Sequence, residues 1–220
     1  MVTREAWARF ARRSAGDWRH GVGTLAALAR GAYYALYFRL FRRDVVIELP
    51  FLAYERVSII GPGSVRIAPS CSVHPNVFRG LSVVTLSPAA VVRIGPRCSL
   101  GGLDIRCHQR VVIGQKTMTA HSLIQDVILF SDPERRTDAG LPRGAVEVGR
   151  NAWLGGLTCL LGPTTVGDDS VLSWGATCLN VIVPPASLAS GSPVTRTVPI
   201  DRVQLLERSA RDSGATRLPV

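Results

Sequence analysis

Three histidines, His74, His108 and His121, are the side chains of this sequence best suited to proton transfer near neutral pH. An imidazole gains and loses its proton in that range, so a histidine beside a hydroxyl or amine can serve as a general base. A catalytic zinc site needs three converging histidines with one pair close in sequence, and the intervals here are 34 and 13 residues. We therefore predict no metal centre. Cys107 directly precedes His108, but neighbouring side chains of a strand point to opposite faces, which disfavours a nucleophile and base pair.

The cysteines and the first residues of the chain indicate a reducing compartment. The 5 cysteines are odd in number and include no CxxC pair, so we expect free, buried thiols in a cytoplasmic protein. The basic opening has neither the uninterrupted apolar run nor the small-residue cleavage site of a secretory signal.

The charge of the chain is strongly basic, with 26 Lys and Arg against 16 Asp and Glu, a formal net charge of +10. No nucleic-acid-binding motif accompanies it, so we predict no nucleic-acid partner. A phosphate-bearing cofactor, an anionic substrate or an acidic membrane surface would fit the same charge. Arg135, Arg136 and Arg143 favour an anionic substrate or a phosphate-bearing carrier.

An aliphatic or small apolar residue recurs at every sixth position between residues 146 and 178. The positions are Val148, Leu154, Leu160, Val166, Leu172 and Cys178. Ala, Ser or Thr stands four residues after each of the first five, and a glycine directly follows three of them, at Gly149, Gly155 and Gly167. A helix would repeat its apolar face about every 3.6 residues, so this period excludes one.

We expect each hexad to form one short strand and one corner, and three hexads to close one triangular coil. The aliphatic residues would then stack inside a prism at the inter-strand spacing of about 4.8 Å. Glycine would permit positive φ at the corners. This pattern predicts an all-β solenoid of parallel strands, whose ends need caps because they expose strand edges.

The flanks of the repeat differ from it. Residues 1–44 are predicted to be helical, and the β-domain spans 45–200. Between 24 and 43 the apolar residues of the predicted helix stand at helical spacing, at Leu25, Leu28, Ala29, Ala32, Tyr33, Leu36, Tyr37 and Leu40. Two roles remain open for this helix: packing against the main domain or a partner subunit, or peripheral membrane contact through residues 24–43. The repeat is interrupted at about 126–145, which predicts an extruded loop, and residues 201–220 predict a short helical tail.

At the level of motifs, the sequence resembles the hexapeptide-repeat acyltransferases, which form a left-handed parallel β-helix. The segment VEVGRNAWLGGLTCLLGPTTVGDDSVLS resembles the family's IGxxxWIGxxxxILPGVTIGDxxVIG run, and VPPASLASGSPV resembles its PPxSVxAGxPA ending. The resemblance covers roughly residues 57–198. It implies a homotrimer that transfers an acetyl or other acyl group from coenzyme A to a hydroxyl or amine of a sugar or other small molecule.

The same resemblance implies residues for the donor. The pantetheine arm of such enzymes lies along the outside of the prism, which assigns donor binding to Trp153, Gly155, Gly156, Gly175 and Thr177. Arg196 would face the nucleotide end of the donor. Any of these glycines could equally be only a corner of the coil.

The chain departs from the family where the chemistry is done. The family's histidine lies just before or within the loop, in stretches resembling DHxH or THPxDP, whereas residues 126–133 are DVILFSDP and no histidine occurs from 122 to 220. The basic residue of the family's TKDVPP segment is also missing from NVIVPP.

Two replacements for the base are open. His121 lies six residues before the expected position. His108 and Asp126 are eighteen residues apart, one coil, so that Asp126 could orient the His108 ring. Otherwise the histidines have no chemical role. We therefore expect an acyltransferase with an atypical site, and the alternative is an inactive scaffold or binding protein, or a different reaction on carboxylates such as Asp126, Asp132 and Glu134.

Overall fold

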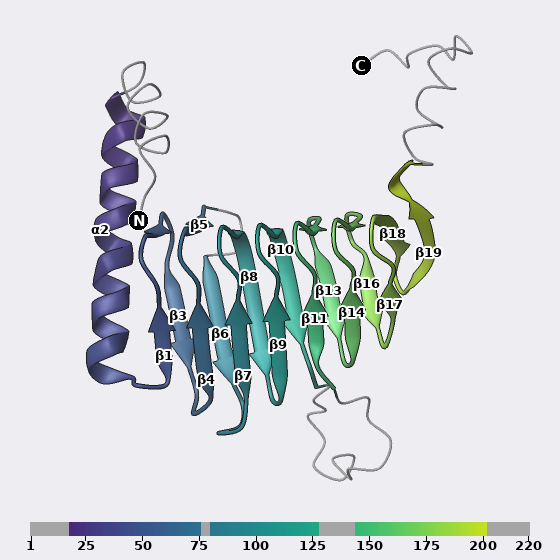
Figure 1. Cartoon of the computed structure of the whole chain (residues 1–220), viewed down its shortest axis with the longest axis horizontal. Helices are drawn as coiled ribbons and strands as arrows, with labels where there is room; N and C mark the ends of the chain where they lie inside the picture. The colour runs from purple at the N-terminus through teal and green to yellow at the C-terminus, as the bar shows by residue number, and fades with distance from the viewer. Residues whose placement is uncertain (1–17, 76–79, 128–143, 202–220) are drawn as a thin grey trace.

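The computed structural model describes residues 18–75, 80–127 and 144–201, which form one helix and a coil of short, mostly parallel strands (Figure 1). The predicted all-β solenoid is confirmed, and its arrangement is consistent with a left-handed β-helix. The predicted N-terminal helix before residue 18, most of the extruded loop and the C-terminal helix lie outside the described residues.

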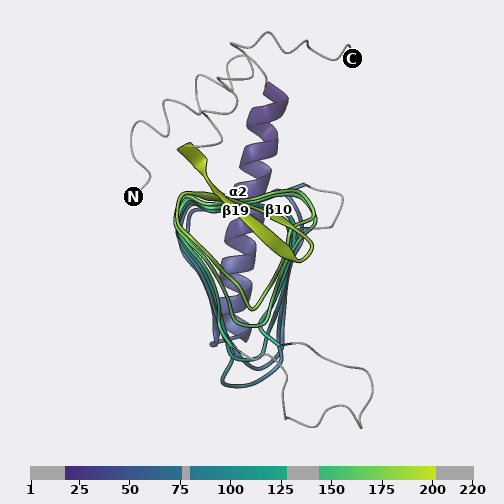
Figure 2. The ribbon, with the colours of Figure 1, turned by 90° about the vertical axis from the view of Figure 1, so that its right-hand side faces the viewer.

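Three walls make up the coil, which is triangular in cross-section when seen along its axis (Figure 2). Wall 1 is a 7-stranded sheet with one strand from each successive coil. Its strands are β1 (Val45–Ile47), β4 (Ser64–Ile67), β7 (Val91–Ile94), β9 (Arg110–Ile113), β11 (Val146–Val148), β14 (Thr164–Val166) and β17 (Ile182–Val183).

Walls 2 and 3 belong to one 12-stranded sheet, because two long strands run through the corner between them. Those strands are β8 (Ser99–Cys107) and β10 (Met118–Gln125). The other strands of wall 2 are β2 (Phe51–Ala53), β5 (Cys71–His74), β12 (Trp153–Leu154), β15 (Val171–Leu172) and β18 (Ser187–Gly191). The other strands of wall 3 are β3 (Val57–Ile60), β6 (Leu81–Thr85), β13 (Thr158–Leu161) and β16 (Thr177–Leu179).

The core is the predicted column of aliphatic side chains. Val148 pairs with Val166, Leu154 with Leu172 and Leu160 with Cys178, each pair eighteen residues apart on adjacent coils. All six side chains are at most 3% exposed. The prediction of three hexads per coil is therefore confirmed, and the burial of these apolar groups drives the coiling.

The glycines that follow the aliphatic positions have a different role from the one predicted. Gly149, Gly155 and Gly167 do not have positive φ, but a Cβ at each would lie 2.4–2.6 Å from atoms of the next coil. Close approach between successive coils excludes a side chain there. The positive-φ corner positions are filled mainly by other residues, such as Lys116 and Asn151.

The two ends of the solenoid are capped differently. Helix α2 (Trp18–Phe41) lies across the first coil, where Gly31 packs so tightly that an added Cβ would lie 1.8 Å from the Phe51 carbonyl oxygen (Figure 1). The last coil is closed by β19 (Val194–Pro199), which pairs antiparallel with β18. No helix in the described part of the chain is long and apolar enough to cross a membrane.

The helix packs on a different face from the one its sequence spacing suggested. Gly21, Ala27, Gly31 and Phe38 are the buried positions. Tyr33 and Leu36, which belong to the predicted apolar face, are 62% and 58% exposed. Of the two predicted roles, packing against the main domain is confirmed for the inner side of the helix.

Candidate active site

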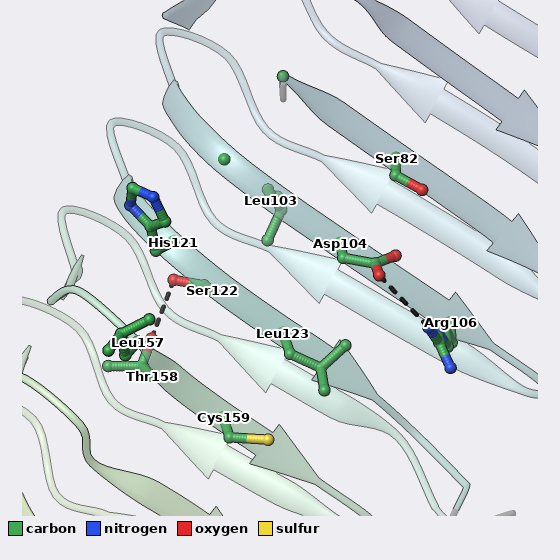
Figure 3. Close-up of a pocket in the computed structure, with 12 residues that line it drawn as sticks. Ser82, Leu103, Asp104, Arg106, His121, Ser122, Leu123, Leu157, Thr158 and Cys159 are labelled. Carbon is green, nitrogen blue, oxygen red and sulfur yellow. Dashed lines mark hydrogen bonds and ion pairs between the residues drawn. The ribbon is translucent and has the colours of Figure 1, made fainter. Parts of the chain in front are cut away.

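A cavity of about 600 Å³ opens on wall 3, at the corner that wall 3 shares with wall 2 (Figure 3). Strands β6, β8, β10 and β13 contribute its lining, so it spans four adjacent coils. The residues with polar or reactive side chains in this lining are Ser82, Asp104, Arg106, His121, Ser122, Thr158 and Cys159.

His121 lies at the corner itself, where β10 turns from wall 2 into wall 3 with a φ of 55°. The strand register places it beside Gly102 of β8, and Gly102 beside Gly80, both also at positive φ. Histidine tolerates this backbone region better than most residues. Gly102 and Gly80, which occupy this corner on the two preceding coils, have no side chains. The half-buried imidazole therefore borders an open space, as Figure 3 shows.

The wall beside His121 carries two further polar pairs. Ser122 and Thr158 share a hydrogen bond of 2.9 Å between their hydroxyls and are both buried. Arg106 lies 3.6 Å from Asp104 Oδ2, while Asp104 Oδ1 is a buried atom with no hydrogen-bond partner among the described residues. The cavity therefore offers an exposed guanidinium for an anion. The sequence analysis did not single out either residue; their outward position on β8 was the only signal.

Asp126 does not orient the ring of His108, so the predicted His–carboxylate pair is wrong. The carboxylate of Asp126 accepts hydrogen bonds from the backbone N–H groups of His108, Gln109 and Arg110 at 2.6, 2.6 and 2.7 Å. The Nδ1 atom of His108 is buried with no hydrogen-bond partner in the described part of the chain. The two residues are neighbours on adjacent coils as expected, but Asp126 fixes the backbone of a turn.

The environment of Cys107 excludes the nucleophile role that the sequence already disfavoured. Its Sγ lies 3.4 Å from Asp126 Oδ2, and burial and the carboxylate together raise the pKa of the thiol to about 12. Burial also raises the pKa of Cys159, which lines the cavity. Neither thiol is primed to form a thiolate, the reactive species.

His74 has a structural environment. Its ring stacks on Tyr54 with centroids 5.3 Å apart, and its Nε2 hydrogen-bonds the hydroxyl of Ser72 at 2.8 Å. Of the three histidines considered, only His121 lines the cavity.

Part of the predicted donor-binding set continues the corner on which His121 lies. The register places Leu157 beside His121 and Gly175 beside Leu157, while the Gly175 N–H donates to the Gly156 carbonyl at 2.8 Å. No atom lies within 4 Å of a Cβ built at Gly175, so this position is open. The ring of Trp174, 72% exposed, packs over Gly156. The sequence analysis did not assign Trp174 to donor binding, although an aromatic residue directly before the corner glycine Gly175 is visible in the sequence.

The other predicted donor-binding residues are more dispersed. Trp153 is exposed on wall 2, and Gly155 is kept small by the Leu172 carbonyl oxygen, 2.6 Å from a built Cβ. The Thr177 hydroxyl hydrogen-bonds that of Ser192 at 2.8 Å. Arg196 is exposed on β19, at the capped end.

Solved structures of acyltransferases are similar to this chain to different degrees. The polySia-specific acetyltransferase NeuO superposes with a TM-score of 0.55 and 18% identity, over 70% of each chain. The fold is shared. Galactoside acetyltransferase in complex with coenzyme A gives a TM-score of 0.45 and 17% identity, over 80% of this chain and 81% of that one.

A third similar structure is a mutant of AntD, an N-acyltransferase from Bacillus cereus, in complex with dTDP-4-amino-4,6-dideoxyglucose and coenzyme A. It gives a TM-score of 0.44 and 13% identity, over 80% of this chain and 96% of that one. No family model matches the sequence, and no curated protein matches it.

Proposed function

We propose that this protein transfers an acetyl or other acyl group from coenzyme A to a hydroxyl or amine of a sugar or related small molecule. The observation that carries the proposal is the cavity of about 600 Å³, which His121 borders on the same corner as Gly156 and Gly175. The motif resemblance over residues 146–198 and the fold shared with an acetyltransferase support it.

In this reaction His121 acts as the general base. The imidazole takes the proton of the acceptor's hydroxyl or amine while its oxygen or nitrogen attacks the thioester carbonyl. The new C–O or C–N bond forms as the C–S bond breaks, and the proton passes from the imidazolium to the departing thiolate. General base catalysis of this kind contributes about 10²–10⁴-fold to a rate.

The acceptor would occupy the wall 3 cavity and the donor the corner beyond it. Arg106, exposed in this cavity, is suited to pair with an anionic group of the acceptor. The acyl-CoA would run past Leu157 toward Gly175 and Trp174. Arg135, Arg136 and Arg143, the other predicted contacts for an anionic acceptor, lie outside the described residues.

We further propose that the active form is a homotrimer, as the resemblance implies, with donor and acceptor meeting between subunits. Light scattering coupled to size-exclusion chromatography measures this state, and a mass of one or two chains would contradict it.

The sequence also favours a second candidate, a scaffold without acyl-transfer chemistry, because the family's histidine is missing after residue 121. One experiment separates the two. Purified protein is tested for thermal stabilisation by acetyl-CoA and longer acyl-CoA thioesters, and for release of free CoA thiol with a panel of sugar and amino-sugar acceptors. Stabilisation with turnover supports the transferase, whereas neither effect with any donor supports the scaffold.

A further inference from the structure

The α2 helix is apolar on two opposite sides, and the prism covers only one of them. Its inner side, with Ala27 and Phe38, is buried. The opposite line of residues is spaced by three or four positions and is exposed. These residues are Val22, Leu25, Ala29, Tyr33, Leu36 and Leu40. A helix that packs one side on a domain normally exposes polar and charged residues on the other, so this uncovered apolar line indicates a binding partner.

Three aromatic residues in the C-terminal half of α2 form a continuous row that begins at Tyr33 of the outer line. The ring centroids of Tyr33 and Tyr37 are 6.1 Å apart, and those of Tyr37 and Phe41 are 5.1 Å apart. Phe41 is 71% exposed. Tyrosine, with an apolar ring and a polar hydroxyl, is favoured at the boundary between lipid and water.

A groove of about 650 Å³ lies between α2 and β1, next to Leu36 of the outer line. Arg39, Arg42 and Arg43 line it together with apolar side chains that include Leu36. Arg42 is held by Asp44 and by the Gly61 carbonyl, whereas Arg39 and Arg43 are exposed. Glu48 also lines the groove and pairs with Arg66 at 3.3 Å. Guanidinium groups next to an apolar surface suit a phosphate carried on acyl chains.

We propose that the outer face of α2 and this groove bind an anionic phospholipid bilayer, with the helix lying in the headgroup region. The charge decides between this partner and a second copy of the chain. In residues 18–43, which contain no Asp or Glu, Arg39 and Arg43 are exposed beside the outer face, so two such faces would repel each other, whereas an anionic lipid surface attracts both these arginines and the apolar line. Since α2 lies across the end of the solenoid, the prism would project from the membrane (Figures 1 and 2).

Co-sedimentation of the full-length protein with phosphatidylcholine vesicles, with and without phosphatidylserine, tests this proposal. We expect binding to the phosphatidylserine vesicles that weakens with added salt. The double variant Arg39→Gln/Arg43→Gln should bind about thirtyfold more weakly, since each arginine close to an anionic surface contributes roughly fivefold. The double variant Leu36→Gln/Leu40→Gln should also lose at least about tenfold, because it removes the apolar contact.

A matched control is Arg93→Gln/Arg97→Gln, which removes the same charge from β7 of wall 1 and the corner after it, away from the groove, and should bind like the unaltered protein. All variants change side chains on the surface, and circular dichroism checks that each is folded. Equal binding of the α2 variants and the wall 1 control, or no preference for phosphatidylserine, would overturn the proposal. An oligomer that the Leu36→Gln/Leu40→Gln variant dissociates would assign the face to a second copy instead. The readout is binding, so its outcome is independent of acyl transfer.

Discussion

The carboxylate of Asp126 accepts a hydrogen bond from the backbone N–H of His108 at 2.6 Å and makes none with the imidazole of that residue. Two more backbone N–H groups converge on the same carboxylate, which is fully buried. Asp126 also accepts a backbone hydrogen bond from Gly144 through its carbonyl oxygen, at 3.4 Å. Asp126 therefore joins the two sides of the interruption between β10 and β11 and holds the turn of the coil below.

We expect Asp126→Asn to lower the free energy of unfolding by about 2–3 kcal/mol, because the amide cannot replace a charged acceptor of three buried bonds. Urea denaturation measures the change. Asp169→Asn is the matched control: Asp169 is exposed and asparagine tolerates its positive φ, so a loss below about 0.5 kcal/mol is expected. Similar losses for both variants would contradict the structural role of Asp126.

His121→Ala should reduce kcat by about 10²–10⁴-fold, because it removes the base. A modest fall in thermal stability is also expected, because alanine tolerates the positive φ of this position less well than histidine does. His108→Ala and His74→Ala serve as controls, and each should retain most of the activity. Steady-state release of CoA thiol measures all three. Full activity in His121→Ala would falsify histidine base catalysis at this cavity.

Trp174→Ala should raise KM for the acyl-CoA donor several-fold and leave KM for the acceptor unchanged, because the exposed indole packs over Gly156 on the proposed donor path. Ile182→Ala removes an equally exposed apolar side chain on wall 1 and should change neither constant. The assignment of the donor path fails if both variants behave alike.

Gly31→Ala should destabilise the protein by about 1–3 kcal/mol or more, since the new methyl group would collide with the Phe51 carbonyl and lift α2 from the prism. Gly23→Ala lies on the same helix in open space, and should stabilise it by about 0.5–1 kcal/mol. Thermal melts of the two variants compare these effects. A loss of stability in both variants would mean that close packing at Gly31 and helix propensity at Gly23 do not account for the effects of the two substitutions.

Two hydrogen bonds from Arg42, 3.0 and 2.6 Å long, lower the pKa of Asp44 at the end of α2. A carboxyl with a lowered pKa stabilises the fold above its unfolded pKa of about 3.9, and this contribution disappears as the pH falls through the lower folded value. Asp44→Asn should therefore cost about 0.5 kcal/mol near neutral pH, with the difference from the unaltered protein closing below pH about 4. Chemical denaturation across this range measures it, and a difference independent of pH would argue against the ion pair.

The sequence alone determined the solenoid, because every coil from Val146 to Cys178 repeats the same local requirement. An aliphatic residue such as Leu154 must meet Leu172 on the next coil, and a small residue must stand at the corner, so the period is visible wherever no residues are inserted. Before residue 124 the coils carry extra residues between strands, and the spacing alone did not fix their register. The role of Gly149 was also beyond the sequence, because close approach and positive φ both select glycine.

Only the tertiary structure decided which side chains meet. Spacing correctly placed Asp126 one coil above His108, but side-chain direction sent its carboxylate to the backbone. Spacing gave α2 an apolar face, yet the closest approach occurs at Gly31, which turns Leu36 and Leu40 outward. The cavity beside His121 arises because Gly80 and Gly102, far apart in the chain, stack at one corner. Such relations depend on the registration of separate coils, and no local pattern records them.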